Sequence, residues 1–154
     1  MPDKPPHFFW QIAQSEGLID LANAVVKELG CQHLILRGEI LGPNIQSNIY
    51  HLSARKVLFF DIQVEQRYLD ADKMLGLFER HGRQDLMVPI LSRDKTLAEW
   101  LAGQSISQAA NGESKLHKTM REGIVIRPSK EQFSPELSGR LIIKQISPEY
   151  LAQG

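Results

Sequence analysis

An α+β domain is the fold class that the sequence predicts, on three observations. The chain of 154 residues has room for one core and for no second full-sized domain. Apolar residues at 42% and charged residues at 23% are ordinary values for a globular protein, which excludes a disordered chain. Strand-like and helix-like segments alternate along the sequence, and several of the strands are expected to be antiparallel.

The first element expected is a helix that follows an irregular N-terminus. Residues 1–7 are rich in proline, so we expect them to be disordered. Residues 8–10 (Phe-Phe-Trp) then form a dense aromatic patch. Apolar residues recur at helical spacing over residues 14–29, and Gly30 is a natural stop.

The next elements are two strands and a helix. They are predicted over residues 33–41, 56–64 and 71–81, respectively. In the first strand, alternation puts Leu34, Leu36 and Ile40 on one face, and Arg37 and Glu39 on the other.

The second half of the chain is expected to be richer in loops. The predicted elements are a short strand over residues 86–91, a short helix over 96–102, a helix stub and loop over 103–119, and strands over 123–127 and 140–146. A loop that holds Pro128 and Pro135 joins the last two strands.

Charge, cysteine content and hydropathy exclude several classes of protein. Eighteen basic and eighteen acidic residues give a net charge of 0, which excludes histone-like coating of a polyanion but allows a local basic groove. Cys31 is the single cysteine, so there is no disulfide framework, and with His33 it falls short of a four-ligand zinc site. No apolar run approaches the roughly 20 residues that cross a bilayer. We therefore expect a cytoplasmic protein that does not enter the membrane.

Charged side chains interrupt three otherwise apolar strands. They lie in Arg37-Gly38-Glu39, in Arg121-Glu122-Gly123, and at Lys144. A charge in such a strand is costly unless it is paired or used. Either each lies on the solvent face of a half-buried sheet, or two carboxylates and one lysine converge on a single groove. Such a groove would bind a sugar hydroxyl, a divalent metal and a phosphate.

Four segments resemble motifs of the ATP-dependent RNA ligases, in the branch that includes the Deinococcus-type enzyme. They are GEILGPNIQSNIY (38–50, motif III), FFDI (59–62, motif IIIa), EGIVIRP (122–128, motif IV) and GRLIIKQIS (139–147, motif V). Their order is that of the family, and the resemblance covers residues 8–152. It implies a covalent nucleotidyltransferase (ligase adenylation) fold, with antiparallel sheets and flanking helices around a nucleotide groove.

The resemblance also implies a chemistry. A lysine of the family takes AMP from ATP, AMP passes to an RNA 5′-phosphate, and a 3′-hydroxyl displaces it, with Mg²⁺ or Mn²⁺ present. By the same resemblance, Glu39 would bind the ribose hydroxyls and Phe60 would stack on adenine. Glu122 would lie by the nucleophilic lysine and the metal, and Lys144 would neutralise the α-phosphate.

Some positions keep alternative interpretations. Phe60 could instead belong to the core, with Phe59 as the stacking residue. Arg37 and Arg127 are expected to be surface or phosphate-facing supports. Gln46 and Asn48 belong to the motif and are expected to cap the turn after Pro43.

The sequence departs from the family at the nucleophile. The family requires Lys-x-Asp-Gly before motif III, and this sequence contains no Asp-Gly pair. Lys27 and Lys73 are followed three residues later by glycine but lack the aspartate. Ile142 stands where many relatives carry a second lysine. We therefore expect a partial, N-terminally incomplete domain over residues 8–152 that does not adenylylate itself. The missing strand would leave an open sheet edge.

Two alternatives to an inactive ligase fragment stay open. In the first, a partner chain supplies the lysine-bearing strand and completes a split ligase. In the second, the chain is a non-catalytic module that binds adenylate or RNA ends.

Overall fold

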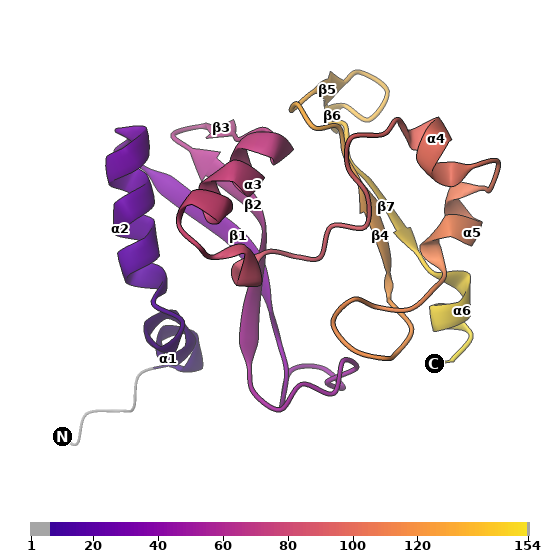
Figure 1. Ribbon diagram of the computed structural model, residues 1–154, viewed down its shortest axis with the longest axis horizontal. Coiled ribbons are helices and arrows are strands. Elements are labelled where there is room, and N and C mark those ends of the chain that lie inside the picture. The colour runs from indigo at the N-terminus through magenta and orange to yellow at the C-terminus, as the bar shows by residue number, and fades with distance from the viewer. Residues whose placement is uncertain (1–6, 154) are drawn as a thin grey trace.

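The computed structural model describes residues 7–153, and its elements form two neighbouring parts (Figure 1). The first part contains α1 (Phe8–Ser15), α2 (Leu18–Leu29), β1 (Leu34–Leu41), β2 (Lys56–Val64), β3 (Arg67–Tyr68), α3 (Ala71–Arg80) and the 3₁₀ turn η1 (Gln84–Leu86). The second contains α4 (Leu97–Leu101), α5 (Ile106–Ala110), β4 (Gly123–Ile126), β5 (Phe133–Ser134), β6 (Gly139–Arg140), β7 (Ile143–Ile146) and α6 (Pro148–Leu151). Every strand pair within these sheets is antiparallel, which confirms the α+β class.

The sheet of the first part has the order β1-β2-β3, and a β-bulge interrupts it. Arg37 lies opposite Asp61, but the next residue, Gly38, lies opposite Phe59, so Phe60 is the extra residue. The bulge shifts the alternation of β2. As a result Phe59 and Ile62 both face the core, although they are three residues apart.

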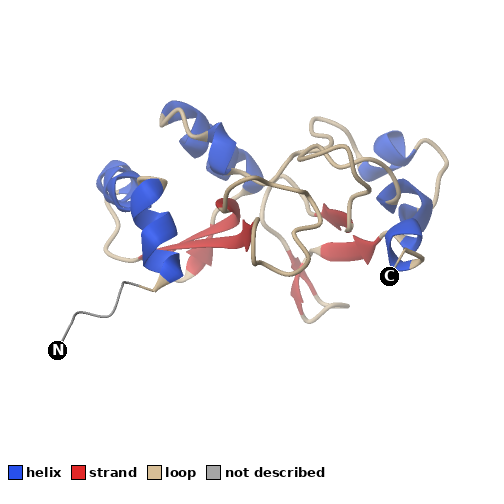
Figure 2. Cartoon of the chain, turned by 90° about the horizontal axis from the view of Figure 1, so that it is seen from below, coloured by secondary structure: helices blue, strands red, loops and turns tan. Residues whose placement is uncertain are grey.

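Helices pack against one face of this sheet and enclose the core (Figure 2). Phe59 stacks on Phe78 of α3 with ring centroids 6.0 Å apart. The buried apolar cluster consists of Ile12, Leu21, Val25, Val57, Phe59, Ile62, Met74, Leu77, Phe78 and Leu86. The opposite face of β1 and β2 is therefore the one that carries Arg37, Glu39 and Asp61.

The predicted helix over residues 14–29 is wrong as a single helix. The chain forms α1 and α2, which are separated at Gly17 because this residue adopts a left-handed conformation with φ 63°. The aromatic patch Phe8-Phe9-Trp10 opens α1, and His7 caps that helix by accepting a hydrogen bond from the backbone N–H of Phe9. The rest of the segment expected to be disordered, residues 1–6, lies outside the described residues. Gly30 ends α2, as predicted.

The predicted strand over residues 86–91 is also wrong. Leu86 ends η1, and only Met87 forms a bridge, to Phe59, before Pro89, which has no N–H to continue a ladder. The strands predicted over 33–41 and 56–64 and the helix predicted over 71–81 are confirmed as β1, β2 and α3. The predicted helix over 96–102 is α4, which begins with a capping box between Thr96 and Glu99.

The second part is built on the pair β4 and β7. Gly123 lies so close to β7 that a Cβ added there would be 2.8 Å from Cα of Ile146 and would collide with the carbonyl of Gln145. The predicted strand over 140–146 is divided into β6 and β7, and β6 forms a hairpin with β5 inside the segment expected to be a loop. Within residues 7–153 no helix has the length and apolar character needed to cross a membrane.

Candidate functional site

Glu122 and Lys144 form an ion pair across the β4–β7 sheet. Lys144 Nζ lies 3.3 Å from Glu122 Oε1, and the two side chains are 60% and 39% exposed. An exposed pair of this kind contributes about 1 kcal/mol or less to stability. The two charged groups therefore lie close together, contribute little to the stability of the fold and remain accessible to a ligand.

Val125 adds an apolar surface beside Lys144. The two residues are directly paired in the sheet, so their side chains leave on the same face. Val125 is 61% exposed, which is unusual for a valine in a strand. This face of the sheet thus combines an ammonium group with an open aliphatic surface. Val125 was not among the residues predicted for the site.

Tyr50 connects Glu122 to the opposite part of the molecule. Its phenol is half-buried and makes a hydrogen bond with the backbone of Glu122. Burial raises the pKa of Tyr50 most and outweighs the hydrogen bond with the Glu122 backbone, which lowers it; the charges of Glu122 and Glu39 add to the rise. The hydrogen bond thus places the β1–β2 loop, which carries Tyr50, against the start of β4. Tyr50 is the last residue of the segment 38–50, and no role was predicted for it from the sequence.

Phe60 and Phe59 differ in their surroundings. Phe59 is 5% exposed and packs in the core, so it is not available to stack on a ligand. Phe60, the bulged residue, is half-buried and is not among the core residues. It lies next to Asp61, whose side chain points toward the second part. Phe60 is thus the aromatic side chain of this pair that a ligand can reach.

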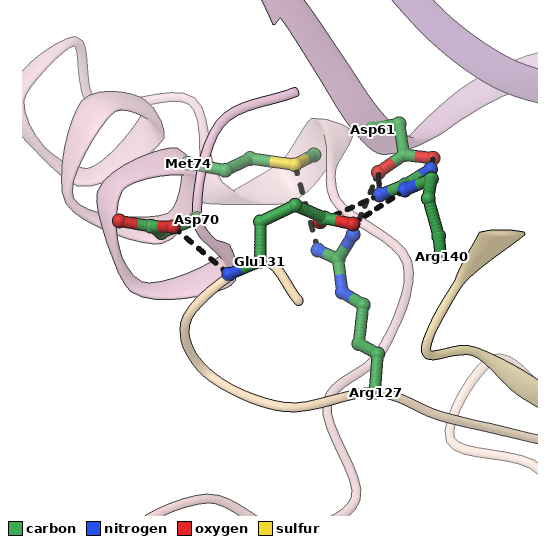
Figure 3. Close-up of polar contacts among 6 residues, drawn as sticks. All are labelled: Asp61, Asp70, Met74, Arg127, Glu131 and Arg140. Carbon is green, nitrogen blue, oxygen red and sulfur yellow. Dashed lines mark hydrogen bonds and ion pairs between the residues drawn. The ribbon is translucent and has the colours of Figure 1, made fainter. Parts of the chain in front are cut away.

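Asp61 is the centre of a charged cluster between the two parts (Figure 3). Its side chain is 8% exposed and pairs with Arg127 at 2.7 Å and with Arg140 at 2.7 Å. Arg140 also binds Glu131 at 2.6 Å and lies 3.6 Å from the ring centroid of Tyr68. Burial raises the pKa of Asp61, but the hydrogen bonds and charges of both arginines outweigh it and hold the pKa below its ordinary value.

This cluster corrects the expectation for Arg127. Arg127 was expected to be a surface or phosphate-facing support, whereas the structure pairs it with a buried carboxylate. Arg37 keeps a more exposed position, with its guanidinium 5.3 Å from the ring centroid of Tyr68. Asp61 and Arg140 were not predicted to interact. The sequence gives one indication of this contact, which is the charge of Asp61 inside an otherwise apolar strand.

Asn48 holds the loop between β1 and β2. Its amide donates to the carbonyl of Leu52 at 3.0 Å, and its side-chain oxygen accepts from the N–H of Leu52 at 3.1 Å. Asn44, Gln46 and Asn48 all have positive φ, with values of 62°, 45° and 46°. Asn48 therefore caps the turn over residues 48–52, later in the loop than the turn after Pro43 for which this role was predicted. Gln46 contributes its left-handed backbone to the same loop.

A hollow of about 510 Å³ lies elsewhere, between α1 and the β1–β2 loop. It is lined by Phe8, Gln11, Ile12, Ser15, Pro43, Asn44 and Arg55, and none of the four predicted site residues is among them. In the described part of the chain no three His, Cys, Asp or Glu side chains gather as a metal site. A metal here would need ligands beyond the protein, such as phosphate oxygens, because Mg²⁺ is commonly bound by one or two carboxylates and its substrate. Glu122 fits that limited role.

Comparison with known proteins identifies the class of this fold. The chain is similar to RNA ligase of Naegleria gruberi with PPi, at 28% identity and a TM-score of 0.67, over 94% of this chain and 40% of that one. A mutant of that ligase with ATP and Mn matches at 27% identity, a TM-score of 0.69, and coverage of 94% and 40%. An apo mutant matches at 26% identity, a TM-score of 0.70, and coverage of 99% and 42%. The fold is the nucleotidyltransferase fold of these ligases.

The family follows from a model for RNA ligase, which matches residues 2–146. The chain belongs to the RNA ligase family. It spans about two fifths of the length of the ligase structures that it matches. No curated protein sequence matches the chain.

Proposed function

We propose that this chain supplies the part of an ATP-dependent RNA ligase that holds the adenylate, in a branch that resembles the Deinococcus-type enzyme. The observation that carries the proposal is the Lys144–Glu122 ion pair, at 3.3 Å, on a sheet where Lys144 is paired with the exposed Val125. Glu122 and Lys144 belong to two separate motifs of the sequence, and the fold brings their charges together.

Each group has a role that its chemistry suits. Lys144 provides the positive charge that neutralises the α-phosphate. Glu39 is an acceptor-only carboxylate that receives hydrogen bonds from the ribose hydroxyls. Phe60 stacks on one face of the adenine, and the exposed aliphatic surface of Val125 suits the other face. Glu122 holds Mg²⁺ or Mn²⁺ together with phosphate oxygens.

The relatives support the choice of ligand and substrate. Some of the Naegleria gruberi ligase structures hold ATP and Mn, AMP and Mn, or PPi, and others are apo. We infer that this chain takes ATP and a divalent cation in the same way. We also infer that its other substrates are RNA ends, a 5′-phosphate and a 3′-hydroxyl, in RNA end joining or repair. The cytoplasm, where ATP and divalent cations are available, is the compartment we propose.

The attacking lysine is the group that this sequence does not offer. No Lys-x-Asp-Gly occurs in the 154 residues, so we propose that the chain by itself does not form the covalent lysine–AMP intermediate. A partner chain that supplies this segment would complete the enzyme. The sheet order β1-β2-β3 leaves β1 at an edge, where a further strand can pair, and this observation favours a split ligase over a purely non-catalytic adenylate-binding or RNA-binding module.

Nucleotide binding and adenylylation test the proposal separately. We expect calorimetry with ATP and Mg²⁺ to show reversible binding by the chain, and ATP labelled at the α-phosphate to leave no covalent label on it. Lys144→Ala and Glu39→Ala should each weaken binding by about tenfold, the loss of one charge-assisted contact. Lys130→Ala removes an exposed lysine from the loop after β4 and should leave affinity unchanged.

Three outcomes contradict parts of the proposal. Unchanged affinity in both Lys144→Ala and Glu39→Ala would remove the assigned site. Absence of binding by the wild-type chain would remove the proposed function of the isolated chain. A covalent AMP adduct on the wild-type chain would disprove the argument about the lysine, whereas an adduct that needs an added motif-I polypeptide would support the split ligase.

A further inference from the structure

The two parts of the molecule contact each other through polar groups at both ends of the β4–β7 sheet. At one end, Tyr50 of the first part makes its hydrogen bond with Glu122, directly before β4. At the other end, the Asp61 carboxylate binds Arg127 and Arg140. Lys144 and Val125 lie between these two attachments, in the middle of the sheet.

The ion pairs of Asp61 connect it to both strands of the β4–β7 sheet. Arg127 directly follows β4, and Arg140 belongs to β6, just before β7 begins. Because β4 and β7 are antiparallel, with Ile126 opposite Ile143, the end of one strand and the start of the other lie together. One carboxylate therefore holds the same end of the sheet through two separate arginines.

The geometry of the cluster leaves little freedom. Asp61 Oδ1 accepts from Arg127 Nη1 at 2.7 Å and from Arg140 Nη2 at 2.9 Å, while Oδ2 accepts from Arg140 Nη1 at 2.7 Å. The guanidinium of Arg140 is in turn bound by both oxygens of Glu131, at 2.6 Å and 2.8 Å. Paired planar groups of this kind fix orientation as well as distance.

The neighbouring loop strengthens the attachment. The N–H of Glu131 donates to Asp70 Oδ1 at 2.9 Å, and Arg127 Nη2 lies 3.8 Å from the sulfur of Met74 in α3 (Figure 3). Asp61, Asp70 and Met74 belong to the first part, and their partners belong to the second. The cluster is thus a junction between the parts.

We propose that Asp61 is a positioning residue that holds the β4–β7 sheet at a fixed separation from β2. Phe60 directly precedes Asp61, so this separation also sets the distance from Phe60 to Val125 and Lys144. The consequence for nucleotide binding rests on the function proposed above, but the separation itself does not. Asp61 would act through the two arginines without touching the ligand.

The test measures the separation and the affinity independently. In a Cys31→Ser background, spin labels at Asn23→Cys on α2 and Gln104→Cys between α4 and α5 report the distance between the parts by pulsed electron paramagnetic resonance. Asp61→Asn, which keeps the side-chain shape, should broaden that distance distribution. It should also weaken ATP binding by about tenfold or more, because misplaced groups lose much of their effect.

Glu28→Gln is the matched control. Glu28 also binds two basic side chains, Arg80 at 2.6 Å and His81 at 2.8 Å, but all three belong to the first part. This variant should leave both the distance distribution and the affinity unchanged. Arg127→Gln removes one of the two arginines that bind Asp61 and leaves Arg140 in place, so it should broaden the distribution less than Asp61→Asn does. If Asp61→Asn does not fold, Arg127→Gln tests the positioning role of Asp61 in its place.

The outcomes separate the two proposals. A folded Asp61→Asn or Arg127→Gln variant with an unchanged distance distribution overturns the positioning role. An equal broadening in Glu28→Gln overturns it as well, because the effect would then be general. If Asp61→Asn broadens the distribution while the wild-type chain binds no ATP, the positioning role is supported and the proposed function fails.

Discussion

Asp61→Asn should lower the free energy of unfolding by about 2–4 kcal/mol at neutral pH. Removing one partner of a buried ion pair costs about 3–5 kcal/mol, since the remaining charge stays buried without its partner. Here Arg127 and Arg140 are 21% and 24% exposed, so water and Glu131 compensate part of the loss. We therefore expect a cost below the upper end of that range.

The same contact predicts how stability depends on pH. The pKa of Asp61 is lower in the folded chain than in the unfolded one, where it lies at about 3.9. The folded state therefore binds fewer protons in this range. The stabilisation by Asp61 is complete above the unfolded pKa and is lost as the pH falls through the folded pKa. The difference in unfolding free energy between wild type and Asp61→Asn should thus be constant near neutral pH and shrink below about pH 4.

Urea denaturation followed by circular dichroism, at a series of pH values, measures both effects. The slope of free energy against urea must stay similar in the two proteins for the comparison to report stability. A loss below about 1 kcal/mol at neutral pH, which is the size expected of an exposed pair, would refute the reasoning. A difference that grows on acidification would refute the pKa argument.

Two further substitutions separate structural from ligand-binding roles. Phe59→Ala should cost about 3–5 kcal/mol of unfolding free energy because it empties a core position, whereas Phe60→Ala should cost clearly less but weaken ATP binding, as urea denaturation and calorimetry would show. Equal stability losses without any change in affinity would contradict this assignment. Gly123→Ala should destabilise the β4–β7 pair by about 1–3 kcal/mol, because the new methyl group meets the backbone of β7. Gly139→Ala is its control, since a Cβ there would meet only the carbonyl of Leu137 at 3.7 Å, and equal melting temperatures for the two variants would count against the close approach.

Individual helices and strands could be predicted where the apolar residues of one segment repeat with a helical or strand period. The apolar run over 56–64 and the helical spacing over 71–81 predicted β2 and α3, because each segment buries the side that its own period presents. The segment 86–91 has a similar apolar content and forms no strand. Pairing depends on a partner strand, and among the strands of the described residues only β2 contacts this segment, through Phe59, which bridges Met87 and accepts from the N–H of Val88.

The bulge at Phe60 shows why the site could be predicted only in part. Simple alternation puts Phe60 and Ile62 on the same face, but the extra residue moves Ile62 to the core face with Phe59. Such a shift depends on the register with β1, which the strand does not encode alone. Glu39, Phe60, Glu122 and Lys144 could be named from their motifs, while the Lys144–Glu122 ion pair and the contact of Tyr50 with the Glu122 backbone required the fold.

The sequence by itself determined the α+β class, most of the elements and the motif residues, because these depend on the period and type of nearby side chains. Only the tertiary structure decided that Asp61 joins the two parts. Its partners Arg127 and Arg140 lie 66 and 79 residues away, and several other arginines had the same charge. A guanidinium finds a particular carboxylate only when strand register and loop closure bring them together, and no local pattern carries that information.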